Sequence, residues 1–212
     1  MKPYQQAIKR LVDLILSAFG LALSSPLFLL IALFIKLDSK GPALFRQTRV
    51  GKDSKPFTCY KFRTMYVDAP DIRNPDGSSF NAPDDPRVTR IGRFLRKTTL
   101  DEVPQLINVL KGDMSIVGPR PDQLDQVRFY SERDKKRLLV KPGMTGWAWI
   151  HGRNSIHWEL RRELDVEYVE NYSLWLDFQI LLQTIPMVLL AKGVYVSPET
   201  IQRYQESQNA PS

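Results

Sequence analysis

"LVDLILSAFGLALSSPLFLLIALFI", residues 11–35, is the stretch that decides the fold, because it is long and apolar and its only charged residue is Asp13. A straight helix of this length, rising about 1.5 Å per residue, would reach roughly 37 Å and exceed the ~30 Å hydrocarbon core of a bilayer. A straight membrane span is one interpretation. A cleaved signal peptide is another, but the apolar run continues for about ten residues beyond the possible cleavage site, which signal peptides do not need.

The middle of this run supports a third interpretation, a re-entrant helix that bends and returns to the same side of the membrane. Ser25 and Pro26 interrupt the helix: the proline frees the carbonyl of Ala22, and serine hydroxyls can satisfy freed backbone groups. Basic residues, which favour the cytoplasm, flank both ends, at Lys2, Lys9 and Arg10 before the run and at Lys36, Lys40, Arg46, Arg49, Lys52 and Lys55 after it. A re-entrant helix satisfies both flanks, yet spanning helices also tolerate proline, so the residues alone leave both topologies open.

The composition of the 212-residue chain points to an anionic partner and a reducing compartment. A total of 30 Lys and Arg against 23 Asp and Glu gives a formal net charge of +7, which suits nucleic acid, anionic lipid or a phosphate-bearing substrate. The single cysteine, Cys59, excludes an internal disulfide framework. One cysteine and two histidines also argue against a zinc site, whereas carboxylates could still bind a hard cation.

Two segments after the apolar run predict a hairpin and a loop. Residues 43–65, "ALFRQTRVGKDSKPFTCYKFRTM", alternate apolar and polar side chains around a turn at residues 51–54, which predicts a β-hairpin with Lys61 and Arg63 on one face. Residues 67–87 are rich in Pro, Asp, Asn and Gly without periodicity. They predict a long loop of a kind that is commonly disordered or functional, for example as a lid.

Residues 87–97, "RVTRIGRFLRK", predict a helix with a basic stripe beside its apolar residues. A solvated helix face is the simpler interpretation. A basic stripe directly before two carboxylates favours anion binding, because anionic side chains can approach an anionic substrate only where cations share the charge. The stripe consists of Arg87, Arg90, Arg93, Arg96 and Lys97.

The remaining segments are mainly helical, so the predicted fold class is α+β and mostly helical, with one small β-hairpin. Helices are expected over residues 122–141 and 155–172. Residues 174–190 are apolar enough to contact lipid but include polar residues such as Asp177, so they predict an amphipathic helix in the membrane interface. Each of the four tryptophans could lie at the depth of the lipid headgroups or in the protein core, and the sequence favours neither. They are Trp147, Trp149, Trp158 and Trp175.

Two adjacent carboxylates, Asp101 and Glu102, lie in "KTTLDEVPQLINVLKGDMSIVGPRP", residues 97–121, and either cap a helix or perform chemistry. The segment from Thr99 to Glu102 matches a capping box. Pro104 fits better if Asp101 is the N-cap, because the proline then lies in the first turn, where no N–H is needed. Adjacent helical residues point about 100° apart, so two functional carboxylates would have separate roles.

The same stretch predicts the end of this helix and a rigid cation after it. The helix is expected to run to Lys111, with Gly112 as its C-terminal stop. "GPRP", residues 118–121, then places prolines on both sides of Arg120 and limits the positions of its guanidinium. That arrangement suits bidentate phosphate binding, although structural rigidity explains the motif equally well.

Together these motifs resemble the monotopic bacterial phosphoglycosyl transferases over nearly the whole chain. The resemblance rests on the Ser25-Pro26 segment, on "YKFRTM" at residues 60–65, on "LRKTTLDEVPQLINVLKGDMSIVGPRP" at 95–121 and on "KPGMTGWAWIHGRN" at 141–154. It implies a re-entrant membrane helix over residues 1–37 and a catalytic domain over 38–212 on the cytoplasmic face of the bacterial inner membrane. The chain looks like the minimal catalytic form of the family.

The resemblance also implies site residues and a cofactor. Asp101 would be the nucleophile and a contact to Mg²⁺, and Glu102 would orient the metal or activate the acceptor. Arg96 and Arg120 would bind substrate phosphate, and Lys61 and Arg63 of "YKFRTM" are further candidates for this role. Many members read "GWAQVNGRN" where this chain has "GWAWIHGRN", so Trp149 and His151 put the sugar or nucleotide specificity in doubt but not the chemistry.

The implied reaction transfers a sugar-1-phosphate from a nucleotide sugar, expected to be a UDP-sugar, to undecaprenyl phosphate. UMP would leave, and a covalent aspartyl-phosphosugar would form on the way. This is the first membrane step of glycoconjugate synthesis, for an O-antigen, capsule, exopolysaccharide or glycoprotein glycan. The expected partners are the donor, the polyprenyl phosphate, membrane lipid and a possible second copy of the chain. A non-catalytic basic membrane-binding module is the alternative, and no nucleic-acid motif is recognisable.

Overall fold

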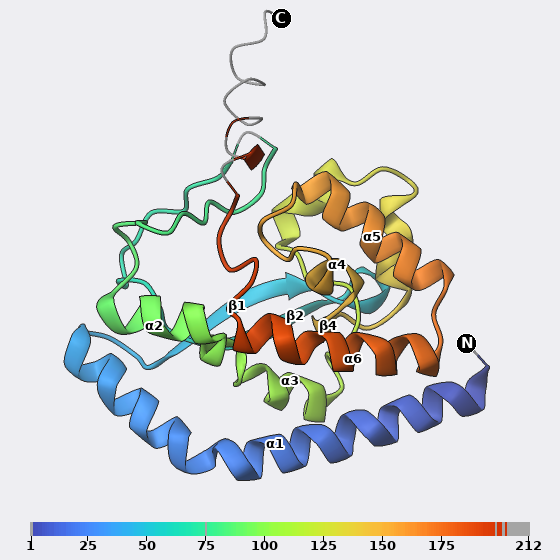
Figure 1. Cartoon of the computed structure of the whole chain (residues 1–212), viewed down its shortest axis with the longest axis horizontal. Helices are drawn as coiled ribbons and strands as arrows, with labels where there is room; N and C mark the ends of the chain where they lie inside the picture. Colours follow the sequence, from blue (N-terminus) through green and yellow to red (C-terminus); the bar gives the residue numbers. More distant parts are fainter. Residues whose placement is uncertain (1, 75, 198, 201, 203–212) are drawn as a thin grey trace, which may run out of the picture.

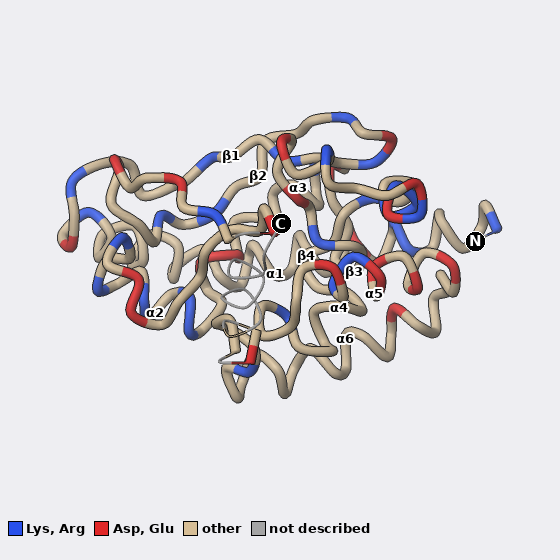
Figure 2. Tube along the Cα trace, turned by 90° about the horizontal axis from the view of Figure 1, so that it is seen from above, with Lys and Arg blue, Asp and Glu red and all other residues tan. Residues whose placement is uncertain are grey.

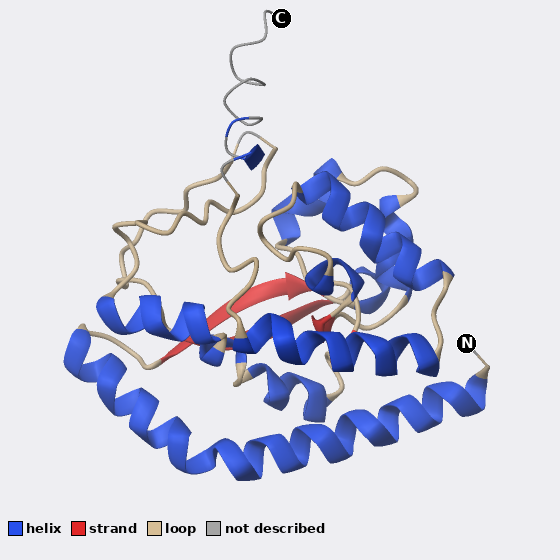
Figure 3. Ribbon diagram, in the orientation of Figure 1, coloured by secondary structure: helices blue, strands red, loops and turns tan. Residues whose placement is uncertain are grey.

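The computed structural model describes residues 2–74, 76–197, 199, 200 and 202, and it confirms the predicted α+β, mostly helical class. Two short pairs of strands lie at the centre, and helices surround them (Figure 3). The long helix α1 (Pro3–Asp38) runs along one edge of the molecule, under the other elements in the view of Figure 1. Within the described residues, α1 is the one helix long and apolar enough to cross a membrane.

Helix α1 is continuous over 36 residues, contains Pro26, and is bowed along its length (Figure 1). Pro26 has no N–H to offer the carbonyl of Ala22, which instead accepts a hydrogen bond from Ser25 Oγ at 2.9 Å. Ser24 Oγ donates to the carbonyl of Gly20 at 2.6 Å. The predicted local satisfaction of the backbone by serine hydroxyls is therefore confirmed.

Both halves of α1 pack against the same body of the protein. In the N-terminal half, Asp13 is 4% exposed and accepts a hydrogen bond from the backbone N–H of Ile116 at 2.9 Å. In the C-terminal half, Ile35 packs in a core cluster with Phe62 and Leu95. The opposite face of α1 is apolar and exposed, notably at Phe19, Leu23, Leu29 and Leu33.

The predicted hairpin is confirmed as β1 (Leu44–Val50) and β2 (Pro56–Phe62), which pair antiparallel with Gln47 opposite Cys59. The turn between them is the short 3₁₀ segment η1 (Lys52–Ser54), which contains two positive φ angles. Lys61 is the last residue but one of β2, and its side chain is mostly buried, with 18% of its surface exposed. The next element of the chain is the predicted long loop, residues 67–87, which has no helix or strand among its described residues.

Arg87 belongs to this loop and not to the basic helix, so that part of the prediction is wrong. It is buried, pairs with Asp85 at 2.7 Å and donates to the carbonyl of Pro70 at 2.8 Å. The helix that follows, α2 (Arg90–Thr98), begins only after Thr89, whose side chain accepts from the N–H of Gly92. The arginines at helical spacing include Arg87, which lies before the start of α2. The N-cap residue Thr89, rather than the spacing of the arginines, determines where the helix begins.

The second pair of strands, β3 (Ser115–Val117) and β4 (Gly143–Thr145), is parallel and joins two of the quoted motifs. A Cβ on Gly143 would lie 2.1 Å from the nitrogen of Gly118, and one on Gly146 would lie 2.2 Å from the Gly118 oxygen. The main chains of "GPRP" and "KPGMTG" therefore touch at positions that only glycine can occupy.

The helix predicted over residues 122–141 is wrong, because the chain forms two 3₁₀ segments there, η3 (Leu124–Phe129) and η4 (Asp134–Leu139). Between them the N–H of Ser131 bonds to Asp134 Oδ2 at 2.9 Å, and the N–H of Asp134 bonds back to Ser131 Oγ at 3.1 Å. Such side-chain bonds to the backbone compete with a continuous helix. The predicted helices are confirmed as α3 (Gln105–Lys111), α5 (Trp158–Glu170) and α6 (Leu174–Leu189). Helix α4 (Trp147–Ile150) lies within residues 142–154, for which the sequence predicted a loop.

Helix α6 turns its one charged residue inward. Asp177 is 7% exposed, accepts from Lys9 Nζ at 2.7 Å and from the Tyr168 hydroxyl at 2.6 Å. Figure 2 shows the trace of α6 almost entirely in tan, because Asp177 is the one charged residue of the helix. Its exposed face carries large apolar side chains at Trp175, Phe178, Leu182, Ile185 and Leu189.

The tryptophans divide between core and surface. Trp149 and Trp158 are 5% and 3% exposed, and Trp147 packs against the core cluster that contains Tyr168. Trp175 is 66% exposed on α6. Headgroup depth therefore remains an option for Trp175 alone, and the other three tryptophans shape the interior.

Candidate active site

A cleft of about 1220 Å³ lies between the hairpin, the long loop and the segments around α2 and β3. Residues far apart in the sequence meet on its wall because the loop, the end of β2 and "GPRP" converge there. All six residues predicted for catalysis and phosphate binding line it, Lys61, Arg63, Arg96, Asp101, Glu102 and Arg120.

The two carboxylates lie in a short 3₁₀ turn, η2 (Leu100–Glu102), between α2 and α3, so the capping-box interpretation is wrong. Thr99 ends α2 in the left-handed conformation, with φ of 62°, and its side chain caps no helix. Asp101 is not an N-cap either, because α3 begins after Pro104. The predicted helix end is confirmed, since Gly112 has φ of 90° and closes α3.

Glu102 is the paired member of the two carboxylates. Its Oε1 accepts from Lys61 Nζ at 2.7 Å and from Arg120 Nη2 at 3.0 Å, and the residue is 5% exposed. Burial alone would raise the pKa of Glu102, but the charges of Arg120 and Lys61 lower this pKa well below its usual range. Glu102 is therefore held as an anion between two cations from distant segments.

Asp101 is the unpaired member. It is 8% exposed, and within the described part of the chain its Oδ1 is buried without a hydrogen-bond partner. Burial, together with the charge of Glu102, raises the pKa of Asp101 to about 6 against the opposing charges of Lys61, Arg153 and Arg96. Neighbouring carboxylates whose pKa values are driven apart are typical of separate catalytic roles.

Arg96 and Arg120 reach the cleft from rigid positions. Arg96, on α2, donates to Thr64 Oγ1 at 3.0 Å and approaches Asn81 Oδ1 at 3.3 Å, so neutral groups orient it. Arg120 follows β3 directly, and the charge of Glu102 raises the pKa of its guanidinium. Both cations are thus fixed before any substrate binds.

Arg63 lines the cleft but is not brought to the carboxylates. Its Nε donates to the carbonyl of Pro42 at 2.6 Å, and Nη2 donates to the carbonyl of Ser39 at 2.9 Å. These bonds tie the segment after α1 to the end of the hairpin. A phosphate-binding role for Arg63 stays a prediction, whereas Lys61 contacts Glu102 directly.

Arg153 is a site residue that the sequence reasoning missed. It is 5% exposed, has φ of 56°, and donates from Nη1 to Thr99 Oγ1 at 3.1 Å. Its charge acts on Asp101 and Glu102. The signal for this role is the arginine that "GWAWIHGRN" has in common with the family motif "GWAQVNGRN".

Trp149 lies beneath Arg153 and supports it. The Arg153 guanidinium carbon is 4.6 Å from the centroid of the Trp149 ring, a cation–π arrangement. His151 lies elsewhere: it is exposed, and its Nδ1 is 2.8 Å from the carbonyl oxygen of Trp147. Of Trp149 and His151, the structure brings only Trp149 to the site.

The site fits a metal ion that is shared with a substrate. Among the described residues no three His, Cys, Asp or Glu side chains cluster as a complete ligand set. Mg²⁺ commonly takes one or two carboxylates and fills its other positions with phosphate oxygens and water. The unpaired Oδ1 of Asp101 suits such an ion.

Comparison with known proteins places the chain in a family. A model of the family described as bacterial sugar transferase matches residues 4–191. The chain is 45% identical over 206 residues to an uncharacterized sugar transferase, EpsL, of Bacillus subtilis, which covers 97% of this chain and 99% of that protein. It is 44% identical to the UDP-glucose:undecaprenyl-phosphate glucose-1-phosphate transferase of Caulobacter vibrioides, over 88% of this chain and 72% of the relative.

The chain belongs to the bacterial sugar transferase family and is a transferase enzyme, as the motif resemblance predicted. It is also 41% identical to the undecaprenyl-phosphate galactose phosphotransferase of Salmonella typhimurium, over 89% of this chain. The match spans only 42% of the Salmonella protein, so the chain corresponds to less than half the length of this relative.

Proposed function

We propose that this protein transfers a sugar-1-phosphate from a UDP-sugar to undecaprenyl phosphate and releases UMP. The observation that carries the proposal is the buried Asp101 with an unpaired carboxylate oxygen, beside a Glu102 that is ion-paired to both Lys61 and Arg120. The names of the Caulobacter and Salmonella relatives support a sugar-phosphate transfer to undecaprenyl phosphate. A module that only bound lipid would have no use for a buried, unpaired carboxylate.

The first step uses Asp101 as the nucleophile. One oxygen of its carboxylate attacks the phosphorus that bears the sugar, a new O–P bond forms, and the bond to the bridging oxygen breaks, while the other oxygen would remain available to Mg²⁺. The bridging oxygen keeps the electron pair and leaves as part of UMP. An oxygen of undecaprenyl phosphate then attacks the same phosphorus and releases Asp101 as a free carboxylate.

The cations of the cleft balance the charge of the donor. Lys61, Arg96, Arg120 and Arg153 are the cations that act on Asp101 and Glu102, and they exceed the two carboxylates in number, which leaves positive charge for the diphosphate of a UDP-sugar. Arg96 and Arg153, which are not paired to Glu102, are free to hold phosphate oxygens. Mg²⁺ bound at Asp101 would further neutralise the diphosphate of the donor, from which UMP leaves.

The test of this function is a donor screen with the purified full chain. UDP-glucose, UDP-galactose and UDP-N-acetylgalactosamine are each incubated with undecaprenyl phosphate and Mg²⁺, and the release of UMP is measured. Intact-mass analysis with the donor alone should show a phosphosugar adduct that Asp101→Asn abolishes. Release of UMP without any adduct, or an active Asp101→Asn variant, would contradict the covalent route.

The proposal includes a re-entrant α1 on the cytoplasmic face of the inner membrane. Both halves of α1 pack against one body, through Asp13 in one half and Ile35 in the other, which supports a return of the helix to its side of entry. The exposed apolar face of α6 would lie in the same interface. This depth would bring the cleft to the phosphate of a membrane-embedded acceptor.

Cysteine accessibility in intact cells tests this topology. Cys59 is buried, so a Cys59→Ser background allows a single cysteine at Lys2 to report the position of the N-terminus. A label that cannot cross the membrane should leave this cysteine untouched, and it should also miss the matched control Lys135→Cys on the exposed surface of the domain. Labelling at position 2 alone would favour a straight span.

A further inference from the structure

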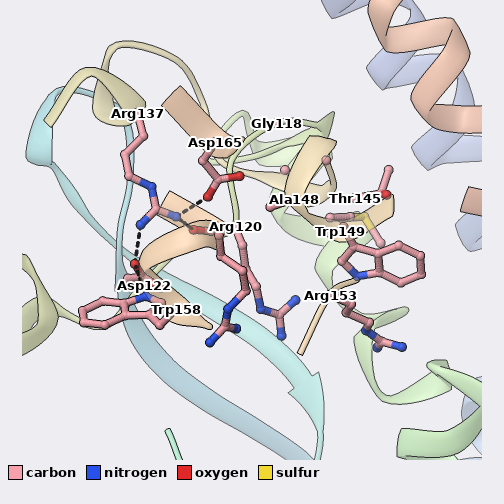
Figure 4. Close-up of a pocket in the computed structure, with 14 residues that line it drawn as sticks. Gly118, Arg120, Asp122, Arg137, Thr145, Ala148, Trp149, Arg153, Trp158 and Asp165 are labelled. Atoms are coloured by element: carbon pink, nitrogen blue, oxygen red, sulfur yellow. Dashed lines mark hydrogen bonds and ion pairs between the residues drawn. The ribbon is translucent and has the colours of Figure 1, made fainter. Parts of the chain in front are cut away.

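A buried cluster of charges lies behind Arg120 and has no part in the proposed chemistry. Arg137, 3% exposed, lies between the carboxylates of Asp122 and Asp165 and is ion-paired to both (Figure 4). Its Nη1 also donates to the Tyr130 hydroxyl at 2.9 Å. Its Nη2 donates to the carbonyl oxygen of Arg120 at 2.8 Å.

The cluster stabilises the fold less well than apolar residues could. Burying two carboxylates around one guanidinium carries a desolvation penalty that apolar residues of similar volume would avoid. The imbalance is visible at Asp165, where burial raises the pKa to about 6 and Oδ1 has no hydrogen-bond partner in the described part of the chain. Asp122 is better satisfied, since Tyr130 and Trp158 also donate to its Oδ2.

The cluster fixes the main chain at Arg120. On one side, Gly118 packs against the backbone of Gly143 and Gly146. On the other side, Arg137 holds the carbonyl of Arg120, and Arg49 Nη1 donates to the carbonyl of Pro121 at 3.1 Å. From this fixed main chain the Arg120 side chain extends to Glu102, with Nη2 3.0 Å from Oε1.

We infer that Arg137, held by Asp122 and Asp165, is a positioning residue that sets the Arg120 guanidinium against Glu102 and the donor phosphates. This inference rests on the proposed transferase function. Arg137 touches no reacting atom, and it acts through the backbone of Arg120. Removing it should therefore weaken catalysis in the same way as partly disabling Arg120.

A double-mutant cycle tests the inference in the full chain, purified in detergent. Arg137→Met, Arg120→Lys and the double variant are compared by kcat/KM for UMP release, with the best donor from the screen. Arg137→Met should lower kcat/KM by roughly 10- to 100-fold in the wild-type background, as expected when a catalytic group is misplaced. It should lower kcat/KM by less than about 3-fold when Arg120 is already Lys, because the two residues act as one unit.

The matched control is Arg162→Met. Arg162 is 12% exposed, lies 4.3 Å over the Trp158 ring and pairs with Asp134 at 3.5 Å, but it does not contact Arg120. Its effect on kcat/KM should be equal in both Arg120 backgrounds. The melting temperature of each variant shows whether a loss of activity comes from unfolding of the protein or from displacement of the Arg120 guanidinium.

The positioning role of Arg137 can also be tested if the first variant fails to fold. If Arg137→Met does not fold, Arg137→Lys and Asp165→Asn enter the same cycle, and single-turnover adduct formation measures rates too slow for steady state. Equal losses from the Arg137 substitution in both Arg120 backgrounds would overturn the positioning role. A wild-type protein that releases no UMP from any donor would instead refute the proposed function.

Discussion

Asp13, a carboxylate inside the apolar helix α1, accepts a hydrogen bond at 2.9 Å from the backbone N–H of Ile116 in β3. Lys9, one turn earlier, donates to the carbonyl of Val117 at 2.9 Å. Strand β3 leads directly into "GPRP" and Arg120. Helix α1 is therefore joined by polar bonds to the strand that precedes a cation of the site, and not only by apolar packing.

Asp13→Leu should destabilise the protein. The substitution leaves the Ile116 N–H and the Ser115 hydroxyl buried without an acceptor, at a cost of about 1–3 kcal/mol. Asp13→Asn keeps an acceptor oxygen and should be milder. Thermal denaturation in detergent measures the difference, with Val12→Ala on the exposed face of α1 as the control. A melting temperature of Asp13→Leu equal to that of the wild type would show that this bond does not hold α1.

Asp101→Asn and Glu102→Gln should separate activity from stability. Asp101→Asn should abolish adduct formation without lowering the melting temperature, because it removes a buried and unpaired charge. Glu102→Gln leaves Lys61 and Arg120 without their anion, so it should also lower stability, by about 3–5 kcal/mol. Adduct mass and thermal unfolding are measured on the same preparations. Equal losses of stability in the two variants would contradict the assignment of Asp101 as the unpaired carboxylate and Glu102 as the ion-paired one.

Stability should depend on pH through Asp101. Its pKa is about 6 in the folded protein and near 3.8 when unfolded, so between about pH 4 and pH 6 the folded state binds more protons. The free energy of unfolding contributed by Asp101 therefore falls as pH rises across this window, by up to about 3 kcal/mol, and is constant above it. Below pH 4 this contribution is fully present.

The measurement is the difference between wild type and Asp101→Asn in urea unfolding, in EDTA so that no metal lowers the pKa. The difference removes the contributions of Asp165, which shifts in the same direction as Asp101, and of Asp122, which shifts in the opposite direction. It retains the interaction of Asp101 with Glu102, which is part of the predicted effect. Parallel pH profiles of the two proteins would mean that Asp101 titrates normally.

Trp149→Gln should weaken use of the donor by freeing Arg153. The cation–π contact contributes about 0.5–2 kcal/mol, which corresponds to a loss of roughly 2- to 30-fold in kcat/KM for the UDP-sugar. Trp149→Phe keeps an aromatic face and should retain most of the activity. Trp175→Gln, on the exposed face of α6, is the control and should leave donor kinetics unchanged in detergent. A Trp149→Gln enzyme with wild-type kinetics would assign Trp149 to the core alone.

Local sequence determined the elements that depend on nearby residues. The hydroxyl bond of Ser25 to the carbonyl that Pro26 frees, the hairpin and the end of α3 at Gly112 are all present as predicted, because proline, alternation and glycine act within a few residues. The motif order was also enough to indicate the family and to single out Asp101 and Glu102 as a pair.

Tertiary structure alone decided which charges meet. Asp177 turns inward because Lys9, 168 residues away in the chain, pairs with it. Glu102 rather than Asp101 is neutralised because β2 and "GPRP" both deliver cations to it, and Arg153 reaches the pair from a third segment. Periodicity describes the face of one element, whereas burial and pairing depend on what another element places opposite it, and that information is absent from any short stretch of sequence.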